Sequence, residues 1–248
     1  VNPSNGTALA TMFHYHSDGW VDADGGCIRS LLFFYVSSSD IMVTIGRSHK
    51  NASAANASST LPGPSREQIY ATATDELGAS ASVSSFADVG LDVVDVVTFV
   101  ANITSELRAN VEDTEIGEVL TTVASCADVL NRYDSDADDD AASEVRSDLL
   151  AIASAVVATS ESLTEEDLEQ QASVLVLLVQ NSHQVDKNMT IAAIDFAGAP
   201  AAVSLQCKRR ANRSRARSQR RQQFKNTRGS SGQHANWHCH LAVVGARR

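Results

Sequence analysis

The sequence has few aromatic residues and no long apolar run, and each shortage narrows the class of protein. Aromatic residues make up only 5% of the 248 residues, so the core must come mainly from Val, Leu, Ile and Ala. The longest apolar run, Ser173 to Val179, is far short of the 18 or so residues that a membrane-spanning helix needs. We therefore expect this piece of the protein to be soluble by itself.

Cysteine is also scarce. The four cysteines, Cys27, Cys126, Cys207 and Cys239, are widely spread and form no Cys-x-x-Cys pair. This number is too small for a disulfide scaffold, and the spacing is wrong for a zinc site. The sequence leaves open which of them pair.

The usual catalytic signatures are absent. No Gly-x-Ser-x-Gly, His-Glu-x-x-His, phosphate-binding loop or dinucleotide fingerprint occurs. His14 and His16 alternate on a strand-like segment, which places both on one face, and two histidines by themselves are more often structural than metal ligands. We predict a protein that is not an enzyme, with no catalytic, cofactor-binding or metal-binding residues.

The segment Asp134–Asp140 has carboxylates at the first, third and fifth positions, as a calcium loop does. Its sixth position is Asp139 where such a loop needs Gly, and its twelfth is Val145 where it needs Glu. An acidic loop between helices is the better interpretation, and adventitious Ca²⁺ binding is the alternative.

Charge is distributed unevenly along the chain. Residues 1–206 hold all 30 acidic side chains and only 8 basic ones, a net charge of −22, whereas residues 207–248 hold 12 Lys and Arg and no acid. We predict a folded acidic body and a disordered basic tail over 207–248. The tail could bind nucleic acid, direct the protein to the nucleus or lie on anionic surfaces, but Phe224 and Trp237 are its only aromatic residues, too few to support a base-stacking surface. It could also be sequence that does not continue the folded module.

Asn-x-Ser/Thr sequons are more frequent than roughly the two that chance would place. They occur at Asn5, Asn51, Asn56, Asn102, Asn188 and Asn212. The first five lie in the body and are the candidate glycosylation sites, while Asn212 lies in the tail and carries no weight. The sequons favour a secreted or extracellular location, with a meaningless excess in a Ser-rich chain as the alternative.

Residues 1–87 have the pattern of strands. Short β-branched and aromatic runs at Leu31–Val36 and Ile41–Ile45, and alternation over Ile69–Thr74, predict a β-sandwich, with a surface loop over Asn51–Pro64. From about Asp88 the apolar period becomes helical. It predicts four helices, of which the third spans about Ala141–Thr159 and the fourth opens at Thr164 with a capping-box pattern.

Alternation returns at Met189, Ile191, Ala193 and Asp195 and predicts a short β segment. The predicted fold class is therefore α+β. An N-terminal β-sandwich-like part (1–87, immunoglobulin or fibronectin III-like) precedes a small helical bundle with a short β return (88–206) and the basic tail (207–248).

Several motifs in order resemble one known family. Val1–Phe13, with its Pro, Gly, Ala-Leu, Thr and Phe series, is followed by Gly19-Trp-Val-Asp22, the aromatic run Leu32–Tyr35 and Tyr70–Ala79. This order resembles the REJ (receptor for egg jelly) module of polycystin-like membrane proteins and covers roughly residues 1–206. The family often has Cys where His16 stands, so its disulfide pattern does not transfer. Trp20 would anchor the sandwich or, alternatively, contact a ligand, Asp22 and Asp24 would form a turn, and Gly78 would adopt positive φ.

The resemblance implies an extracellular ligand-recognition or structural module of a polycystin-like receptor or channel, on the outer side of a plasma or ciliary membrane. Its partner would be an extracellular glycoprotein or other protein, its membrane attachment would lie in other parts of the parent protein, and nucleic acid would not be a partner. The start at Val1 without a signal peptide agrees with a piece of a longer chain. His238-Cys-His-Leu-Ala242 is similar to the family's cleavage motif, but Ala242 lacks the nucleophilic hydroxyl. The alternative function is an intracellular scaffold with a nucleic-acid-binding or nuclear-localisation tail.

Overall fold

The first ninety residues form strands in which buried and exposed side chains alternate. The computed structural model describes residues 1–248 except 23, 50–52, 94, 134–138, 161–163 and 199–248. The strands are β1 (Asn5–Thr7), β2 (Phe13–Ser17), β3 (Ile28–Val36), β4 (Met42–His49), β5 (Ala55–Ser59), β6 (Ser65–Asp75) and β7 (Ser80–Gly90). The runs predicted from β-branched and aromatic residues are confirmed as β3, β4 and β6.

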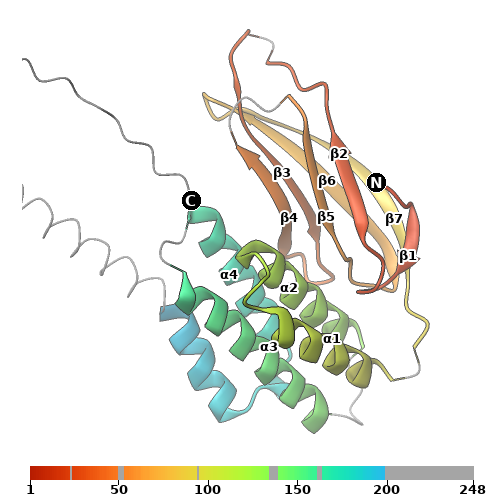
Figure 1. The fold of residues 1–248 in the computed structure, drawn as a ribbon, viewed down its shortest axis with the longest axis vertical. Coiled ribbons are helices and arrows are strands. Elements are labelled where there is room, and N and C mark those ends of the chain that lie inside the picture. Colours follow the sequence, from red (N-terminus) through yellow and green to blue (C-terminus); the bar gives the residue numbers. More distant parts are fainter. Residues whose placement is uncertain (23, 50–52, 94, 134–138, 161–163, 199–248) are drawn as a thin grey trace, which may run out of the picture. The chain divides into compact units, whose positions relative to one another are not determined.

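Within the described residues the strands form two sheets (Figure 1). A mixed sheet has the order β1-β7-β6-β3-β4, with β1 parallel to β7 and the other pairs antiparallel. The second sheet consists of β2 and β5. Its inward residue Tyr15 lies with its ring centroid 6.3 Å from that of Phe33 on β3, so the two sheets face each other across an apolar layer.

Two details of the β part differ from the sequence-based prediction. The predicted surface loop over Asn51–Pro64 is wrong for Ala55–Ser59, which is strand β5. Its inward residues are only Ala and Ser, which give no β signal by themselves, and pairing with β2 fixes the conformation. The strand pattern also continues past residue 87, because β7 stays paired with β6 and β1 up to Val89 and Gly90.

The predicted turns are confirmed. The backbone N–H of Asp24 donates to Asp22 Oδ1 at 3.0 Å, Gly25 N–H donates to Asp22 O, and Gly78 has φ of 89° after β6. Trp20 is half-buried against the core, and its indole N–H donates to Ser17 Oγ at 2.8 Å.

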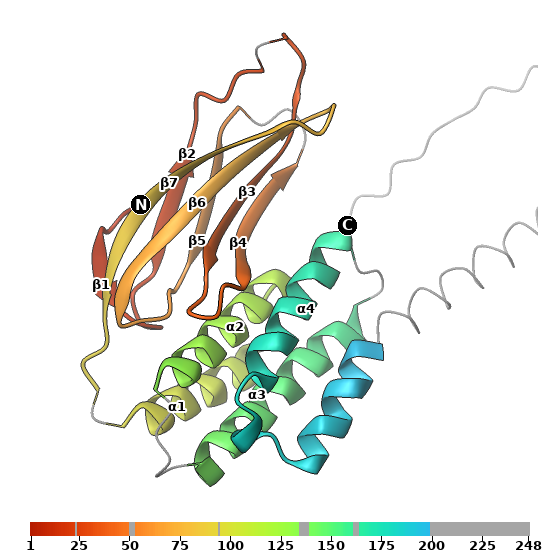
Figure 2. The same cartoon turned by 180° about the vertical axis from the view of Figure 1, so that it is seen from behind.

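Four helices follow, as the apolar period predicts. They are α1 (Val96–Asn110), α2 (Ile116–Arg132), α3 (Asp139–Thr159) and α4 (Glu165–Val179). Asp95 caps α1, so this helix begins later than Asp88. Thr164 and Asp167 form a complete capping box at α4, which confirms that prediction. Figure 2 shows the helices gathered at one end of the sheets.

The β segment predicted after Asp186 is wrong. Residues 187–198 are helical, and they follow a 3-10 turn, η2 (Ser182–Gln184). Met189, Ala193 and Phe196 are buried, at a spacing of four and three residues, whereas Ile191 is half exposed. The apolar residues of this short segment fit the period of a strand as well as that of a helix. The helix forms because it allows one face to pack against the core.

One continuous apolar core runs through the strands and the helices. It includes Phe33 and Tyr35 of β3 and Leu120 and Val123 of α2. The described residues, up to Gly198, belong to one compact unit. Among the described helices, none combines the length and the apolar character needed to cross a bilayer.

Candidate functional site at the junction of strands and helices

The edge strand β4 is closed by side chains from two helices. The backbone carbonyl of Thr44 accepts hydrogen bonds from Thr121 Oγ1 of α2, at 2.8 Å, and from Gln170 Nε2 of α4, at 3.3 Å. The amide of Gln170 also donates to Thr121 Oγ1 at 2.7 Å. A carbonyl at a sheet edge would otherwise offer a pairing site to another strand. The helices therefore protect this edge of the sheet.

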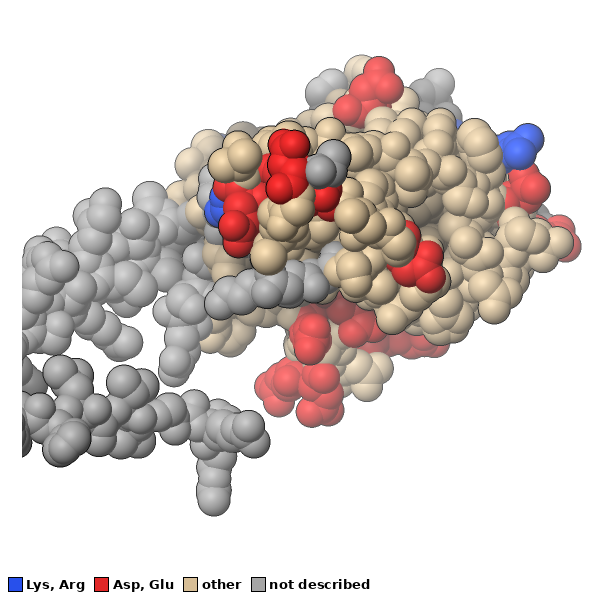
Figure 3. Space-filling view, turned by 90° about the horizontal axis from the view of Figure 1, so that it is seen from above, with Lys and Arg blue, Asp and Glu red and all other residues tan. Residues whose placement is uncertain are grey.

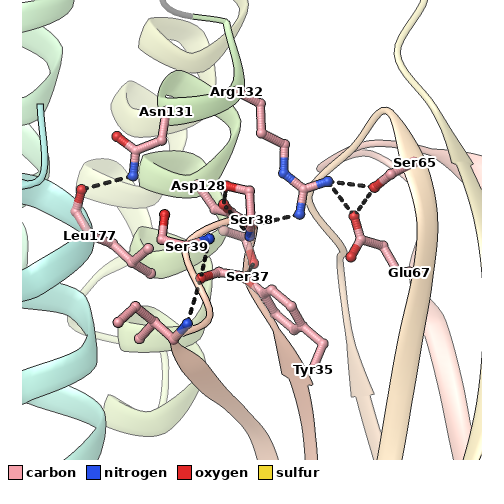
Figure 4. A network of polar contacts seen from close by, with 12 residues as sticks. Tyr35, Ser37, Ser38, Ser39, Ser65, Glu67, Asp128, Asn131, Arg132 and Leu177 are labelled. Atoms are coloured by element: carbon pink, nitrogen blue, oxygen red, sulfur yellow. Dashed lines mark hydrogen bonds and ion pairs between the residues drawn. The ribbon is translucent and has the colours of Figure 1, made fainter.

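A buried ionic network fixes α2 to the sheet (Figure 4). The guanidinium of Arg132, near the end of α2, donates to Glu67 Oε1 of β6 at 2.5 Å and to Asp128 Oδ2 at 2.8 Å. It also donates to Ser65 Oγ. The side chain of Glu67 is 5% exposed and that of Asp128 is fully buried. Each carboxylate has the guanidinium as a partner away from water, and Asp128 is also hydrogen-bonded, which is the condition under which buried charges are tolerated.

The electrostatics of Arg132 follow from this arrangement. Burial acts to lower the pKa of its guanidinium, but the carboxylates of Asp128 and Glu67 outweigh burial and hold the pKa above its ordinary value. Arg132 therefore stays charged and can neither give nor take a proton. The charged guanidinium is suited to holding α2 and β6 together.

Asp128 also holds the turn between β3 and β4. Its Oδ1 accepts the hydroxyl of Ser38 at 2.6 Å and the backbone N–H of Ser38 at 3.2 Å. Deeper in the interface, the hydroxyls of Tyr35 and Ser125 lie 3.3 Å apart. Burial raises the pKa of Tyr35 well above its ordinary value, and the nearby Asp128 adds to the rise. Tyr35 is therefore a neutral hydrogen-bonding group of the interface.

A second buried arginine joins the helices to one another. Arg146 of α3 is fully buried and donates from Nε to Gln184 Oε1 of η2 at 2.7 Å, and from Nη2 to Asn131 Oδ1 of α2 at 2.8 Å. Its Nη1 donates to the carbonyl of Leu177 of α4 at 3.3 Å. Asn131 and Leu177 are linked in turn, at 3.0 Å (Figure 4). One side chain thus crosslinks α2, α3, α4 and η2.

A polar cleft of about 430 Å³ opens beside the junction. Its walls are β4, β5 and the first turns of α2 and α4, and its lining includes Arg47, Ser58, Glu118, Thr122, Asp167 and Gln170. Arg47 lies 3.8 Å from Glu169, and Asp167 is engaged in the capping box. The lining is rich in hydroxyl groups and mixed in charge, and one of its hydroxyls, that of Thr164, donates to Asp167 Oδ2 at 2.9 Å.

The outer face of the β2–β5 sheet carries both predicted histidines. His14 and His16 are exposed on the same face of β2, as their alternation predicts. His16 Nδ1 lies 2.7 Å from Asn56 Oδ1 on β5, and its Nε2 lies 3.0 Å from Asp18 Oδ2. These hydrogen bonds, that of Asn56 first and that of Asp18 second, raise the pKa of His16 above its ordinary value. Two acceptors around one ring favour the doubly protonated imidazolium.

The candidate glycosylation sites in the described residues are all exposed. Asn5 lies on β1, Asn56 on β5, Asn102 on α1 and Asn188 in the helical segment 187–198. Asn51 lies outside the described residues. Exposure satisfies the steric requirement for a glycan.

Cys27 is exposed and Cys126 is buried, and both are free thiols. Burial raises the pKa of the Cys126 thiol to about 12, which makes it unreactive at neutral pH. Cys207 and Cys239 lie outside the described residues, as do most of the Asp134–Asp140 loop and the tail. Among the described residues, His, Cys, Asp and Glu nowhere gather in a group of three able to hold a metal ion.

The junction network is the feature that the sequence reasoning missed. Glu67 stands in phase with the buried residues Ile69, Ala71 and Ala73 on β6, and Asp128 lies on the buried face of α2. A carboxylate at a core position signals a buried partner, since an unpaired buried charge is very costly. The basic residue nearest to Asp128 on α2 is Arg132, four residues later, and it is the partner that this signal predicts.

The surface of the described body is acidic. On the face shown in Figure 3, acidic side chains lie in several separate groups and basic ones are few. Some of the surface charges form ion pairs, such as that of Arg108 Nη2 with Asp148 Oδ1 at 2.6 Å.

The fold and the junction define an α+β protein in which a two-layered β part and a helical bundle share one core. Comparison of the chain with protein-family models, with curated proteins and with solved structures gives no match.

Proposed function

We propose that this protein is an extracellular recognition or structural module of the REJ type, from a polycystin-like receptor or channel protein, and that it is not an enzyme. The observation that carries the proposal is the junction. Arg132 binds both Asp128 and Glu67 at the contact of α2 with β6, and Asp128 also binds the β3–β4 turn. Such an arrangement serves to hold two parts in a fixed relation, which is what a structural or recognition module requires.

The strand order supports an immunoglobulin or fibronectin III-like identity for the β part. In those sandwiches the second and fifth strands pair in one sheet, and the third, sixth and seventh strands form the other. Here β2 pairs with β5, and β3, β6 and β7 are neighbours in the other sheet with β4 at the edge. The short β1 joins β7 in parallel, which places the start of the chain against the last strand.

The sequons support the extracellular location. Asn5, Asn56, Asn102 and Asn188 are exposed on strands and helices of the described body, where glycans would cover surface and leave the core undisturbed. The expected partner is an extracellular protein or glycoprotein, bound through surface shape and polar contacts. Membrane attachment would come from other parts of the parent protein.

Native cells that express the protein provide the test. Antibodies against the body should label the surface of intact, non-permeabilised cells, and glycosidase treatment should lower the mass of the native protein. Each single substitution of Asn5, Asn56, Asn102 or Asn188 by Gln should reduce this mass shift by the mass of one glycan. Labelling confined to the nucleus of permeabilised cells, with no glycosidase-sensitive mass, would support the intracellular scaffold instead.

A further inference from the structure

The outer edge of β7 is open along most of its length in the described part of the chain. On one side β7 pairs with β6 along its whole length, from Ser80 to Val89. On the other side, β1 pairs only with Asp88, Val89 and Gly90. Figure 2 shows β1 beside the lower end of β7 alone. Ser80–Phe86 therefore has no neighbouring strand on this side among the described residues.

The backbone groups on this edge point outward at the even-numbered residues. Asp88 N–H donates to Ser4 O at 2.8 Å, and Gly90 O accepts from Ala8 N–H at 2.7 Å, both across the β1 side. Because N–H and C=O direction alternates along an antiparallel strand, Ser80, Ser82, Ser84 and Phe86 direct their backbone groups to the same side. These donors and acceptors form a template for one more strand.

The side chains do nothing to block this template. The segment Ser80-Ala-Ser-Val-Ser-Ser-Phe86 has no charge, no Pro and no Gly, and all seven of its residues are exposed. Native proteins normally protect an edge of this length with a charged side chain, a Pro, a bulge or a covering element. The opposite edge, β4, is protected in this way, since Thr121 and Gln170 occupy the carbonyl of Thr44.

The segment is also complementary to itself. In an antiparallel pair of two β7 strands centred on Val83, Ser82 faces Ser84 and Ser80 faces Phe86, so the outward-pointing residues meet one another. Val83, which is 54% exposed, faces its own copy, and its neighbours there are the small residues Ala81 and Ser85. Such a pairing is two-fold symmetric and closed, which is the commonest form of homo-oligomer.

We propose that the protein forms a homodimer by antiparallel pairing of β7, Ser80–Phe86, with β7 of a second copy, so that the two five-stranded sheets become one continuous sheet. The pairing satisfies the open backbone groups and covers Val83 from the solvent. It does not depend on the compartment in which the protein works, and its failure would leave the proposed function untouched.

The test uses the symmetry of the central pair. The full chain should sediment as a dimer at high concentration and as a monomer on dilution. Val83→Lys and Val83→Glu, each alone, should weaken self-association by about tenfold or more, because like charges meet at the two-fold axis. An equimolar mixture of the two variants should associate again, because Lys then faces Glu. Ile191→Lys, at a residue with similar exposure of 50%, should associate like the wild type.

Two outcomes would overturn the proposal. One is a wild-type chain that stays monomeric at every concentration. The other is association that survives both Val83 variants and weakens with added salt, which would indicate contacts between the acidic body and basic residues of another copy. Hydrogen exchange gives a second readout, since the amides of Ser82 and Ser84 should gain protection as the concentration rises.

Discussion

At the residue scale, the stability of the junction depends on a few charged side chains that are buried in contact with one another. Arg132 faces two carboxylates, so removal of the arginine would leave both Glu67 and Asp128 buried without their cation. Removal of one member of a buried ionic group costs more than the group contributes as a whole, because the penalty of the orphaned charge is added.

Arg132→Met should therefore lower the free energy of unfolding by about 3–5 kcal/mol, as measured by chemical denaturation. Arg66→Met is the matched control, because Arg66 is 67% exposed and pairs with Asp88 only at 3.9 Å. Its effect should stay below about 1 kcal/mol. Equal effects of the two substitutions would contradict the structural role given to the network.

His16 makes a pH-dependent contribution to the free energy of unfolding. Its pKa is raised in the folded state by hydrogen bonds to Asn56 and Asp18. A group with a raised folded pKa stabilises the protein below the unfolded pKa, near 6.5 for His, and this contribution disappears as the pH rises through the folded pKa. The free energy of unfolding should therefore decline above about pH 6.5, and His16→Gln should remove this part of the decline.

An NMR titration of His16 separates the effects of its two hydrogen bonds, to Asn56 and to Asp18, on its pKa. Asn56→Ala should bring the pKa of His16 closer to its ordinary value than Asp18→Ala does, because the hydrogen bond to Asn56 is the larger cause of the rise. The reverse order would show that the Asp18 carboxylate dominates. The same experiment reports on the hydrogen bond between β2 and β5.

At the element scale, local signals fix where α4 begins. Thr164 Oγ1 accepts the N–H of Asp167 at 3.1 Å, and Asp167 Oδ2 accepts the N–H of Thr164 at 2.8 Å. Each bond satisfies a backbone donor that the first turn of a helix leaves open.

Thr164→Ala should lower the free energy of unfolding by about 1 kcal/mol. Ser105→Ala in the middle of α1 also removes an exposed hydroxyl, one that bonds only to the carbonyl of Ala101 in its own helix. This control should change the free energy by less than about 0.5 kcal/mol. A cost no larger than that of the control would mean that the cap contributes nothing to α4.

At the scale of the whole molecule, the shared core predicts cooperative unfolding of strands and helices. Val100 of α1 and Leu120 of α2 belong to the same buried cluster as Phe33 and Tyr35 of β3. In a Trp237→Phe background, the fluorescence of Trp20 reports on the β part and far-ultraviolet circular dichroism reports largely on the helices. The two transitions should coincide, and Arg132→Met should shift both. Separate midpoints would show two independent domains.

The sequence by itself determined the elements whose signals are local. The β-branched runs predicted β3, β4 and β6, the 3.6-residue period predicted α1 to α4, and Thr164 and Asp167 predicted a cap. These signals depend on residues that are close together in the sequence, so the elements can be predicted without knowledge of their distant partners.

Only the tertiary structure decided the rest. Ala55–Ser59 became a strand because β2 offers it a partner, and residues 187–198 became a helix because Met189, Ala193 and Phe196 bury one helical face. Arg132 meets Glu67, 65 residues away along the chain, and β7 is left with a free edge because β1 begins only at Asn5, opposite Asp88. Contacts between residues distant in sequence carry no local signature, and folding alone brings them together.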